Sequence, residues 1–191
     1  MRLTSLDAPV ERDAVLAVAN TRHGRDAQRP VAPRDLAAIP GGFDRLRSAA
    51  EALRFLDALG VARPHAPLER RHLLRLKLAR EAVRALAEGD AAGHERRMRR
   101  LVAGATYRID ATTLRPERDG WDGFVDALAP AVNELAATPK RLKVCHNSAC
   151  GWVFVDETLN SGQVWCTAQG CGPRMRVRRY RRRNARSIKR T

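Results

Sequence analysis

Apolar residues recur at spacings of three and four along most of the first 139 residues. This spacing places them on one face of a helix, so the pattern predicts a series of amphipathic helices. Gly60 and Gly89 follow two of the apolar stripes and are typical of helix ends. Pro130 lies inside the last stripe, where we expect it to kink or break the helix. The predicted helices cover residues 11–22, 43–59, 67–89 and 94–102, and a final segment from Asp119 to Leu135.

Two shorter segments in this part of the chain carry weaker patterns. Residues 35–39 are expected to form one or two helical turns, ended by Pro40 and the two glycines after it. Apolar and polar residues alternate over residues 105–109, which predicts a short strand. Neither segment changes the expectation that this part is mainly helical.

The pattern changes after Pro139, where short β-type runs replace the helical spacing. Residues 153–155 are Val-Phe-Val, residues 160–162 carry the turn signal Asn-Ser-Gly, and residues 163–165 return the chain. We therefore expect a β-hairpin made of the first and last of these runs. A basic helix is expected to follow it, beginning near Cys171.

The two patterns divide the chain into two predicted domains. The fold class is mainly α: a helical N-terminal domain over residues 1–139, and a small treble-clef-like unit over residues 140–191. The second unit combines the β-hairpin with the basic C-terminal helix. A segment of about 50 residues buries too little apolar surface to fold easily without help.

All the cysteines of the chain lie in this second unit, at positions 145, 150, 166 and 171. Two C-x4-C knuckles separated by 15 residues can bring four sulfurs to one tetrahedral ion, and zinc is the usual occupant of such a site. Structural zinc contributes about 10–16 kcal/mol to small fingers. The predicted metal ligands are Cys145, Cys150, Cys166 and Cys171, holding one structural Zn²⁺.

Other interpretations of the cysteines fit less well. Two disulfides, or four unrelated thiols, are disfavoured because the N-terminus lacks a secretory signal. A redox role would favour C-x-x-C spacing, and an iron–sulfur cluster lacks supporting spacing. His146 adjoins the first cysteine, but four sulfurs already complete the coordination shell, so we expect it not to be a ligand.

Charge is distributed very unevenly along the chain. Residues 140–191 hold 13 basic and 2 acidic groups, a net charge of +11, whereas residues 1–139 hold 23 and 19, a net charge of +4. The second unit is therefore expected to bind a polyanion, DNA first, with association with RNA or the ribosome as the alternative. Val177 and Tyr180 are expected to pack back on the finger and turn the arginines outward. The candidate nucleic-acid contacts are Arg174, Arg178, Arg179, Arg181, Arg182, Arg183 and Arg186.

Two alternatives to nucleic-acid binding remain for this charge. In the first alternative, the arginines are a solvated run that keeps the protein soluble. In the second, they contact anionic lipid, which is disfavoured because few large apolar groups accompany them. No uncharged apolar stretch approaches the roughly 18–20 residues of a membrane span. We expect a cytoplasmic protein without a membrane partner, and the composition favours a bacterial source.

We do not expect an enzyme. The five histidines are scattered, familiar catalytic motifs are missing, and a zinc ion with four sulfurs has no open position for substrate. An enzyme whose finger delivers it to nucleic acid remains as an alternative. In the helical domain, Asn20, Thr21 and Arg80 are candidates for binding a small-molecule effector. The alternative for these residues is a helix cap and surface ion pairs. The sequence leaves the oligomeric state open.

Residues 141–145, Cys150 to Asp156, Trp165-Cys166 and the run from Cys171 to Arg174 resemble the CGNR zinc finger. The N-terminal part resembles the ABATE domain that usually precedes it, through residues 18–21, 35–37 and 78–86. The resemblance implies a bacterial protein with a four-cysteine zinc site, proposed to be a stress-induced, DNA-binding regulator of transcription.

One position departs from that family. Gly172-Pro173-Arg174 stands where the family has Gly-Asn-Arg. If the asparagine caps the following helix, the cap is lost, although proline is accepted in a first helical turn because its missing N–H has no partner there. The four sulfurs are unaffected, and the substitution puts in question any base-reading role of that asparagine.

Overall fold

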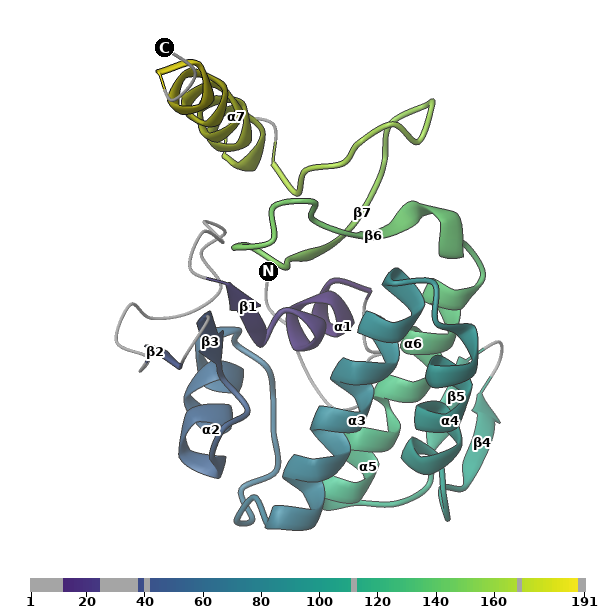
Figure 1. Cartoon of the computed structure of the whole chain (residues 1–191). Coiled ribbons are helices and arrows are strands. Elements are labelled where there is room, and N and C mark those ends of the chain that lie inside the picture. Colours follow the sequence, from purple (N-terminus) through teal and green to yellow (C-terminus); the bar gives the residue numbers. More distant parts are fainter. Residues whose placement is uncertain (1–11, 25–37, 40–41, 111–112, 168–169, 189–191) are drawn as a thin grey trace.

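The computed structural model describes residues 12–24, 38–39, 42–110, 113–167 and 170–188. A helical body carries a small β-hairpin on one side, and the C-terminal helix lies beyond the hairpin at an outer edge of the molecule (Figure 1). The helices are α1 (Arg12–Ala19), α2 (Ala49–Ala58), α3 (Arg70–Ala87), α4 (Ala91–Leu101), α5 (Gly120–Asp126), α6 (Leu128–Ala136) and α7 (Cys171–Ile188), with a 3-10 turn at Pro139–Arg141. The strands are β1 (Arg22–Gly24), β2 (Ala38–Ile39), β3 (Gly42–Asp44), β4 (Tyr107–Asp110), β5 (Thr113–Pro116), β6 (Leu142–Val144) and β7 (Val153–Val155).

Helix α3 is the centre of the body and packs against α1, α4, α5 and α6. Its residues Leu76, Ala79 and Val83 recur at spacings of three and four, and each is at most 1% exposed. This is the apolar stripe that predicted the helix. Gly60 and Gly89 have positive φ angles of 66° and 79°, which confirms both as helix ends. The mainly helical fold class is therefore confirmed.

The break near Pro130 is confirmed, and it lies at Ala127, between α5 and α6. Pro130 is the third residue of α6, where it has no N–H to give to the carbonyl of Asp126. The Tyr107 hydroxyl donates to that carbonyl instead, at 3.2 Å. A side chain from strand β4 thus supplies the hydrogen bond that the proline removes.

The helical turns expected over residues 35–39 are wrong at Ala38–Ile39, which form β2, while residues 35–37 lie outside the described residues. The predicted start of the next helix at residue 43 is also wrong, because residues 42–44 form β3 and the helix begins at Ala49. Strands β1, β3 and β2 form one antiparallel sheet with β3 in the middle. Pairing along the backbone satisfies these short segments better than an isolated helical turn would.

The strand predicted over residues 105–109 is present as β4, and it pairs with β5, which the sequence pattern did not predict. The hairpin expected between residues 153–155 and 163–165 is wrong in its second strand. Residues 163–165 form no strand, and β7 pairs antiparallel with β6 instead. The first knuckle, between Cys145 and Cys150, closes this hairpin.

The β6–β7 hairpin joins two apolar clusters. Leu142 and Val153 belong to the large core of the helical body, whereas Trp152 and Phe154 pack with the four cysteines in a second, smaller core. Successive strand residues point to opposite faces, so one hairpin serves both cores. No helix in the described part of the chain has the length and apolar character needed to cross a membrane.

Candidate metal centre and nucleic-acid interface

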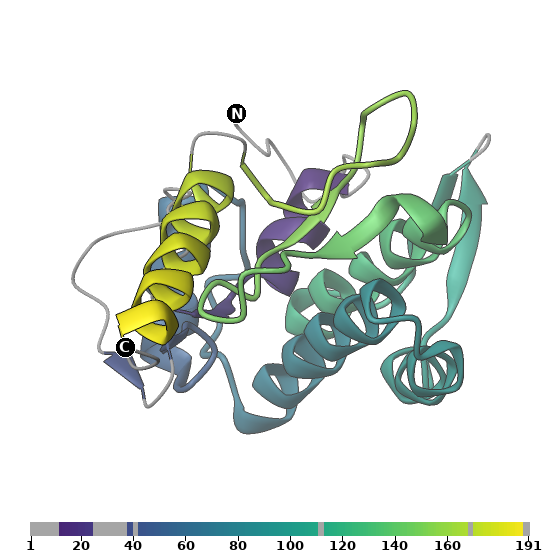
Figure 2. The ribbon, with the colours of Figure 1, turned by 45° about the horizontal axis from the view of Figure 1, so that its top comes forward.

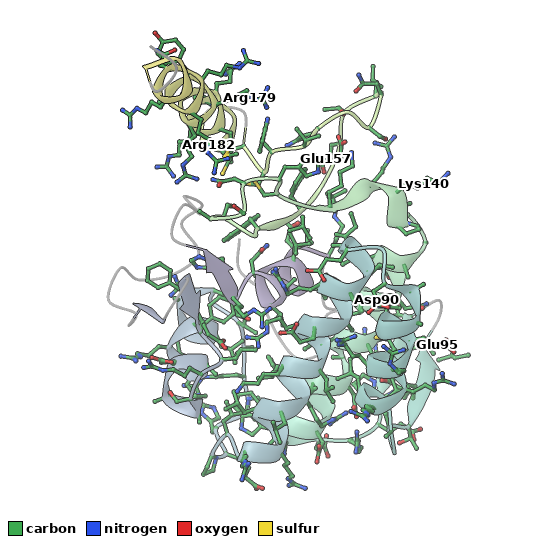
Figure 3. The ribbon with its side chains drawn as sticks, viewed as in Figure 1. Asp90, Glu95, Lys140, Glu157, Arg179 and Arg182 are labelled. Atoms are coloured by element: carbon green, nitrogen blue, oxygen red, sulfur yellow. The ribbon has the colours of Figure 1, made fainter. Side chains whose placement is uncertain are left out.

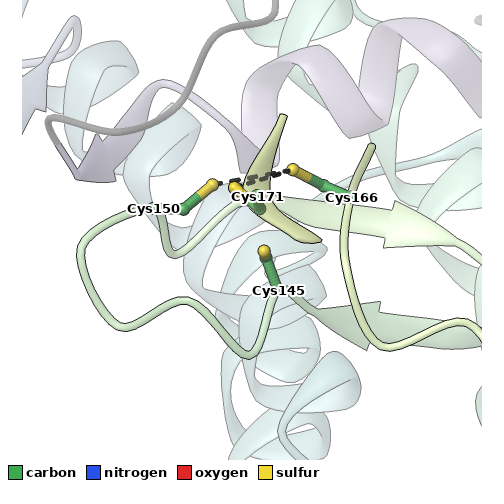
Figure 4. Close-up of side chains that lie close together, drawn as sticks. All are labelled: Cys145, Cys150, Cys166 and Cys171. Carbon is green, nitrogen blue, oxygen red and sulfur yellow. Dashed lines mark hydrogen bonds between the residues drawn. The ribbon is translucent and has the colours of Figure 1, made fainter. Parts of the chain in front are cut away.

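The four cysteines come together from three elements (Figure 4). Cys145 directly follows β6, Cys150 precedes β7, Cys166 lies in the loop beyond the hairpin, and Cys171 is the first residue of α7. Their sulfur atoms all lie within 4.8 Å of one another, and all four residues are buried. The β6–β7 hairpin and the segment that leads into α7 therefore supply two cysteines each.

The sulfur geometry fits one zinc ion. The Sγ atoms of Cys150 and Cys166 are 3.7 Å apart, and those of Cys166 and Cys171 are 3.8 Å apart. Four sulfurs placed tetrahedrally at the usual zinc–sulfur distance of about 2.3 Å would be about 3.8 Å from one another. The four cysteines are thus close enough together to hold one zinc ion, and four thiolates leave no coordination position open for a substrate.

Crowding the thiols together makes full deprotonation unfavourable unless a cation compensates. The contact with Cys145 raises the pKa of the Cys166 thiol to about 12 and raises the pKa of Cys150 further, and burial adds to both shifts. Contacts from Cys150 and Cys166 lower the pKa of Cys145 to about 2. A bound Zn²⁺ would supply the charge that lets all four ionise, so metal binding releases protons and acid opposes it.

Backbone hydrogen bonds set the shape of the first knuckle. The Cys145 N–H donates to the Trp152 carbonyl at 2.8 Å, and the Cys150 N–H donates to the Asn147 carbonyl at 2.7 Å. Gly151 follows with a φ of 61°, a conformation that favours glycine. His146 is exposed, with its ring edge against Trp165, and the ligand cluster consists of cysteines alone.

Asn147 is the polar residue beside the metal centre that the sequence analysis missed. It is fully buried, and its Nδ2 donates to the Cys171 sulfur at 3.5 Å. Its Oδ1 accepts from the Ala149 N–H at 3.2 Å and from Nη1 of Arg178 at 3.0 Å. A side-chain amide inside the C-x4-C knuckle was the available signal, because a buried amide must find several partners.

The loop after β7 is built around the buried carboxylate of Asp156. It accepts from Lys143 Nζ at 2.6 Å, from the Thr158 hydroxyl at 2.6 Å and backbone N–H at 2.9 Å, and from the Gln163 N–H at 2.9 Å. Burial alone would raise the pKa of Asp156, but these hydrogen bonds outweigh it and hold that pKa well below its usual range. Asp156 is therefore ionised, and its carboxylate holds the loop in place through these hydrogen bonds.

The helical body holds the finger through side chains and backbone. Asn20 makes a pair of hydrogen bonds with Val153, at 2.8 Å to its carbonyl and 2.7 Å from its N–H. The Gly24 N–H donates to the Cys150 carbonyl at 2.6 Å, and Nη1 of Arg84 donates to the Gly151 carbonyl at 3.1 Å. The body therefore contacts the backbone of the finger from the second cysteine, Cys150, to Val153.

The structure places the three candidate effector-binding residues in the helical body, where all are buried. Asn20 makes the contacts with β7 just described, and the Thr21 hydroxyl donates to the Val18 carbonyl at 2.7 Å. Arg80 donates from Nη1 to Asp44 at 2.6 Å and from Nε to Glu81 at 2.9 Å. Effector binding by these residues stays a prediction.

Helix α7 begins at Cys171, and Pro173 lies in its first turn, where no N–H partner is needed. From residue 176 to residue 184 the side chains are exposed, and Val177 and Tyr180 are 49% and 65% exposed. The expectation that these two pack back on the finger is wrong, because the helix leaves the finger after its first turns (Figures 1 and 2). They contribute apolar surface to the outer helix instead.

Most of the candidate nucleic-acid contacts lie on this outer part of α7. Arg179, Arg181, Arg182 and Arg183 are exposed, and Figure 3 shows Arg179 and Arg182 on the helix beyond the hairpin. Arg174 is half-buried near the start of the helix, and Arg178 contacts Asn147. The side chain of Arg186 lies outside those that the structure describes.

Comparison with known proteins bears on the C-terminal part alone. Residues 141–184 match the family model described as CGNR zinc finger, a range that runs from the start of the hairpin into the exposed part of α7. No curated protein matches the chain. Together with the sulfur geometry, the match establishes that this chain carries a zinc-finger segment with a four-cysteine metal-binding cluster.

Proposed function

We propose that this chain is a zinc-dependent DNA-binding protein that regulates transcription. The observation that carries the proposal is the arginine-rich helix, which begins at the fourth cysteine and is exposed from residue 176 to residue 184. The metal has a structural role: it fixes the first residue of α7, so that the arginines beyond it are presented together. Arginine binds phosphate and can donate two hydrogen bonds to guanine in the major groove.

The charge of the unit supports the proposal. Residues 140–191 carry a net charge of +11, and the body carries only +4. A thiolate cluster with zinc would lower the total charge of +15 by 2, which leaves the basic surface intact. In the body, the resemblance to an ABATE domain supports effector sensing as the partner activity.

The test is a selection of genomic DNA fragments on the zinc-loaded full chain at physiological salt, followed by sequencing. The matched control replaces Arg181, Arg182 and Arg183 by glutamine, which removes charge from exposed positions and leaves all four cysteines in place. A sharply enriched motif that the control loses supports a specific regulator. Uniform recovery of all fragments would show that the protein binds the phosphate backbone without sequence specificity and would overturn the regulatory role.

RNA is the second candidate, and the exposure of Tyr180 favours it. An aromatic ring that is 65% exposed among arginines can stack on an unpaired base, which duplex DNA does not offer. Competition between a structured RNA with unpaired loops and duplex DNA of equal length separates the two. Replacing Tyr180 by leucine should weaken RNA binding and leave duplex binding nearly unchanged if RNA is the partner.

A further inference from the structure

A chain of hydrogen bonds joins the metal centre to the basic helix. Nδ2 of Asn147 donates to the sulfur of Cys171 at 3.5 Å, and Nη1 of Arg178 donates to Oδ1 of the same amide at 3.0 Å. One buried side chain therefore contacts both a predicted zinc ligand and an arginine of α7. Arg178 is one of the predicted nucleic-acid contacts, and its hydrogen bond to the first knuckle indicates a second role.

The direction of the Asn147 amide follows from its partners. The Ala149 N–H and the Arg178 guanidinium can only donate hydrogen bonds, so the atom that faces them must be the amide oxygen. The amide nitrogen then faces the Cys171 sulfur. Because one amide makes both contacts, a shift of the Cys171 sulfur on metal binding would also move the amide oxygen that Arg178 contacts.

Asn147 contacts α7 at two positions along the helix axis, Cys171 and Arg178. Cys171 and Arg178 are seven residues apart, which is close to two turns and about 10.5 Å along the axis, so both lie on the same face. A helix held only at its first residue can pivot about that point. A second attachment two turns further on fixes its direction. Val177 and Tyr180 are largely exposed and offer little apolar contact that would do so.

We infer that Arg178 is a positioning residue that, through Asn147, links metal binding at Cys171 to the direction of α7. Nucleic acid is then contacted by the exposed arginines beyond it, of which Arg179 and Arg182 are examples. This inference rests on the proposed function for its consequence, since a fixed direction matters only if the helix binds something. The link itself is a property of the finger.

The first test compares Arg178→Ala with Arg182→Ala, four residues further along the same helix, in the zinc-loaded full chain. Affinity for a duplex of about 20 base pairs is measured over a range of salt concentrations. Loss of a phosphate contact reduces the slope of log K against log salt by about 0.9. We expect that reduction for Arg182→Ala. For Arg178→Ala we expect an unchanged slope, with affinity roughly three- to tenfold lower at every salt concentration. An equal loss of slope in both variants would overturn the inference.

The second test needs no nucleic acid. Backbone amide order parameters of residues 179–184 report whether the outer helix moves with the finger. Arg178→Ala and Asn147→Ala should lower them, Arg178→Lys should restore them only in part, and Arg182→Ala should leave them unchanged. Zinc content must stay at one ion per chain in Arg178→Ala. Unchanged order in Arg178→Ala refutes the inference whatever the ligand is. If Arg178→Ala lowers the order parameters but the wild-type protein binds no nucleic acid, the inference stands and only the proposed function is refuted.

Discussion

The helical body and the finger bury their interiors by different means. The body has a large apolar core centred on α3, with residues such as Phe55 and Leu76 at 1% exposure. The finger has a small core of four cysteines with Trp152 and Phe154. The helices of the body offer enough apolar surface to bury a core of their own. The finger is small, and we expect it to need a metal ion for its stability.

The hairpin shows how the two regions depend on each other. Val153 faces the body and Phe154 faces the cysteines, although they are neighbours in one strand. Asn20 from α1 hydrogen-bonds the backbone of Val153 as a paired strand would. The body therefore supports the side of the finger that carries the four cysteines.

Removal of one ligand should unfold the finger and spare most of the body. In Cys171→Ser, or in chelator-treated protein, we expect loss of bound zinc and of about 10–16 kcal/mol of metal-binding free energy. Circular dichroism should keep the signal of the body helices and lose that of α7. The matched control is His146→Ala, an exposed neighbour of Cys145 that should retain one zinc ion. A folded, metal-free Cys171→Ser protein with normal DNA affinity would contradict the structural role of zinc.

Adjacent strand residues should report on different cores. Phe154→Ala is expected to cost about 3–5 kcal/mol, seen mainly as faster loss of zinc to a competing chelator. Val153→Ala is expected to cost about 2 kcal/mol, seen mainly as lower stability of the body in urea. Equal effects of both variants on zinc loss would show that the two cores unfold as one unit.

The hydrogen bonds between Asn20 and Val153 should contribute less to stability than the zinc site or the buried Phe154, but they should couple the body to the finger. Asn20→Ala leaves a buried N–H and a buried carbonyl of Val153 without this partner, at a cost of about 1–3 kcal/mol. We expect unfolding measured by a finger probe to separate from unfolding measured by a body probe. Asn133→Ala, an exposed site on α6, is the control and should change stability by less than about 0.5 kcal/mol. Coincident transitions in Asn20→Ala would argue against the coupling.

The smallest effect is a dependence on pH through Asp156. Its pKa is held below the ordinary value of about 3.9, so its contribution to stability is present above about pH 4 and is lost as pH falls below that. The melting temperature of the wild type should therefore fall more steeply than that of Asp156→Asn as pH falls below about 4. Glu157→Gln, which changes the exposed neighbouring acid, should follow the wild type. Parallel curves for wild type and Asp156→Asn would show that the hydrogen-bond partners do not lower the pKa of the Asp156 carboxyl group.

Local patterns predicted what depends on neighbours in sequence. The stripe on α3, the helix ends at Gly60 and Gly89 and the spacing of the cysteines each follow from a few consecutive residues. Pairings across longer distances were missed. The pairing of β7 with β6 places Lys143 beside Asp156. It was not predicted, because a strand of three residues matches several candidate partners equally well in sequence.

The order of the residues was enough to predict the helical class, the four-cysteine cluster and the positive charge after Cys171, because periodicity, ligand type and charge can be read along the chain. Three other features could be seen only in the folded chain: the exposure of Val177 and Tyr180, the link through Asn147 from Cys171 to Arg178, and the sharing of one hairpin by two cores. Those outcomes depend on which surfaces remain available after the larger core has packed. That is a property of the whole chain, and no local stretch of residues contains it.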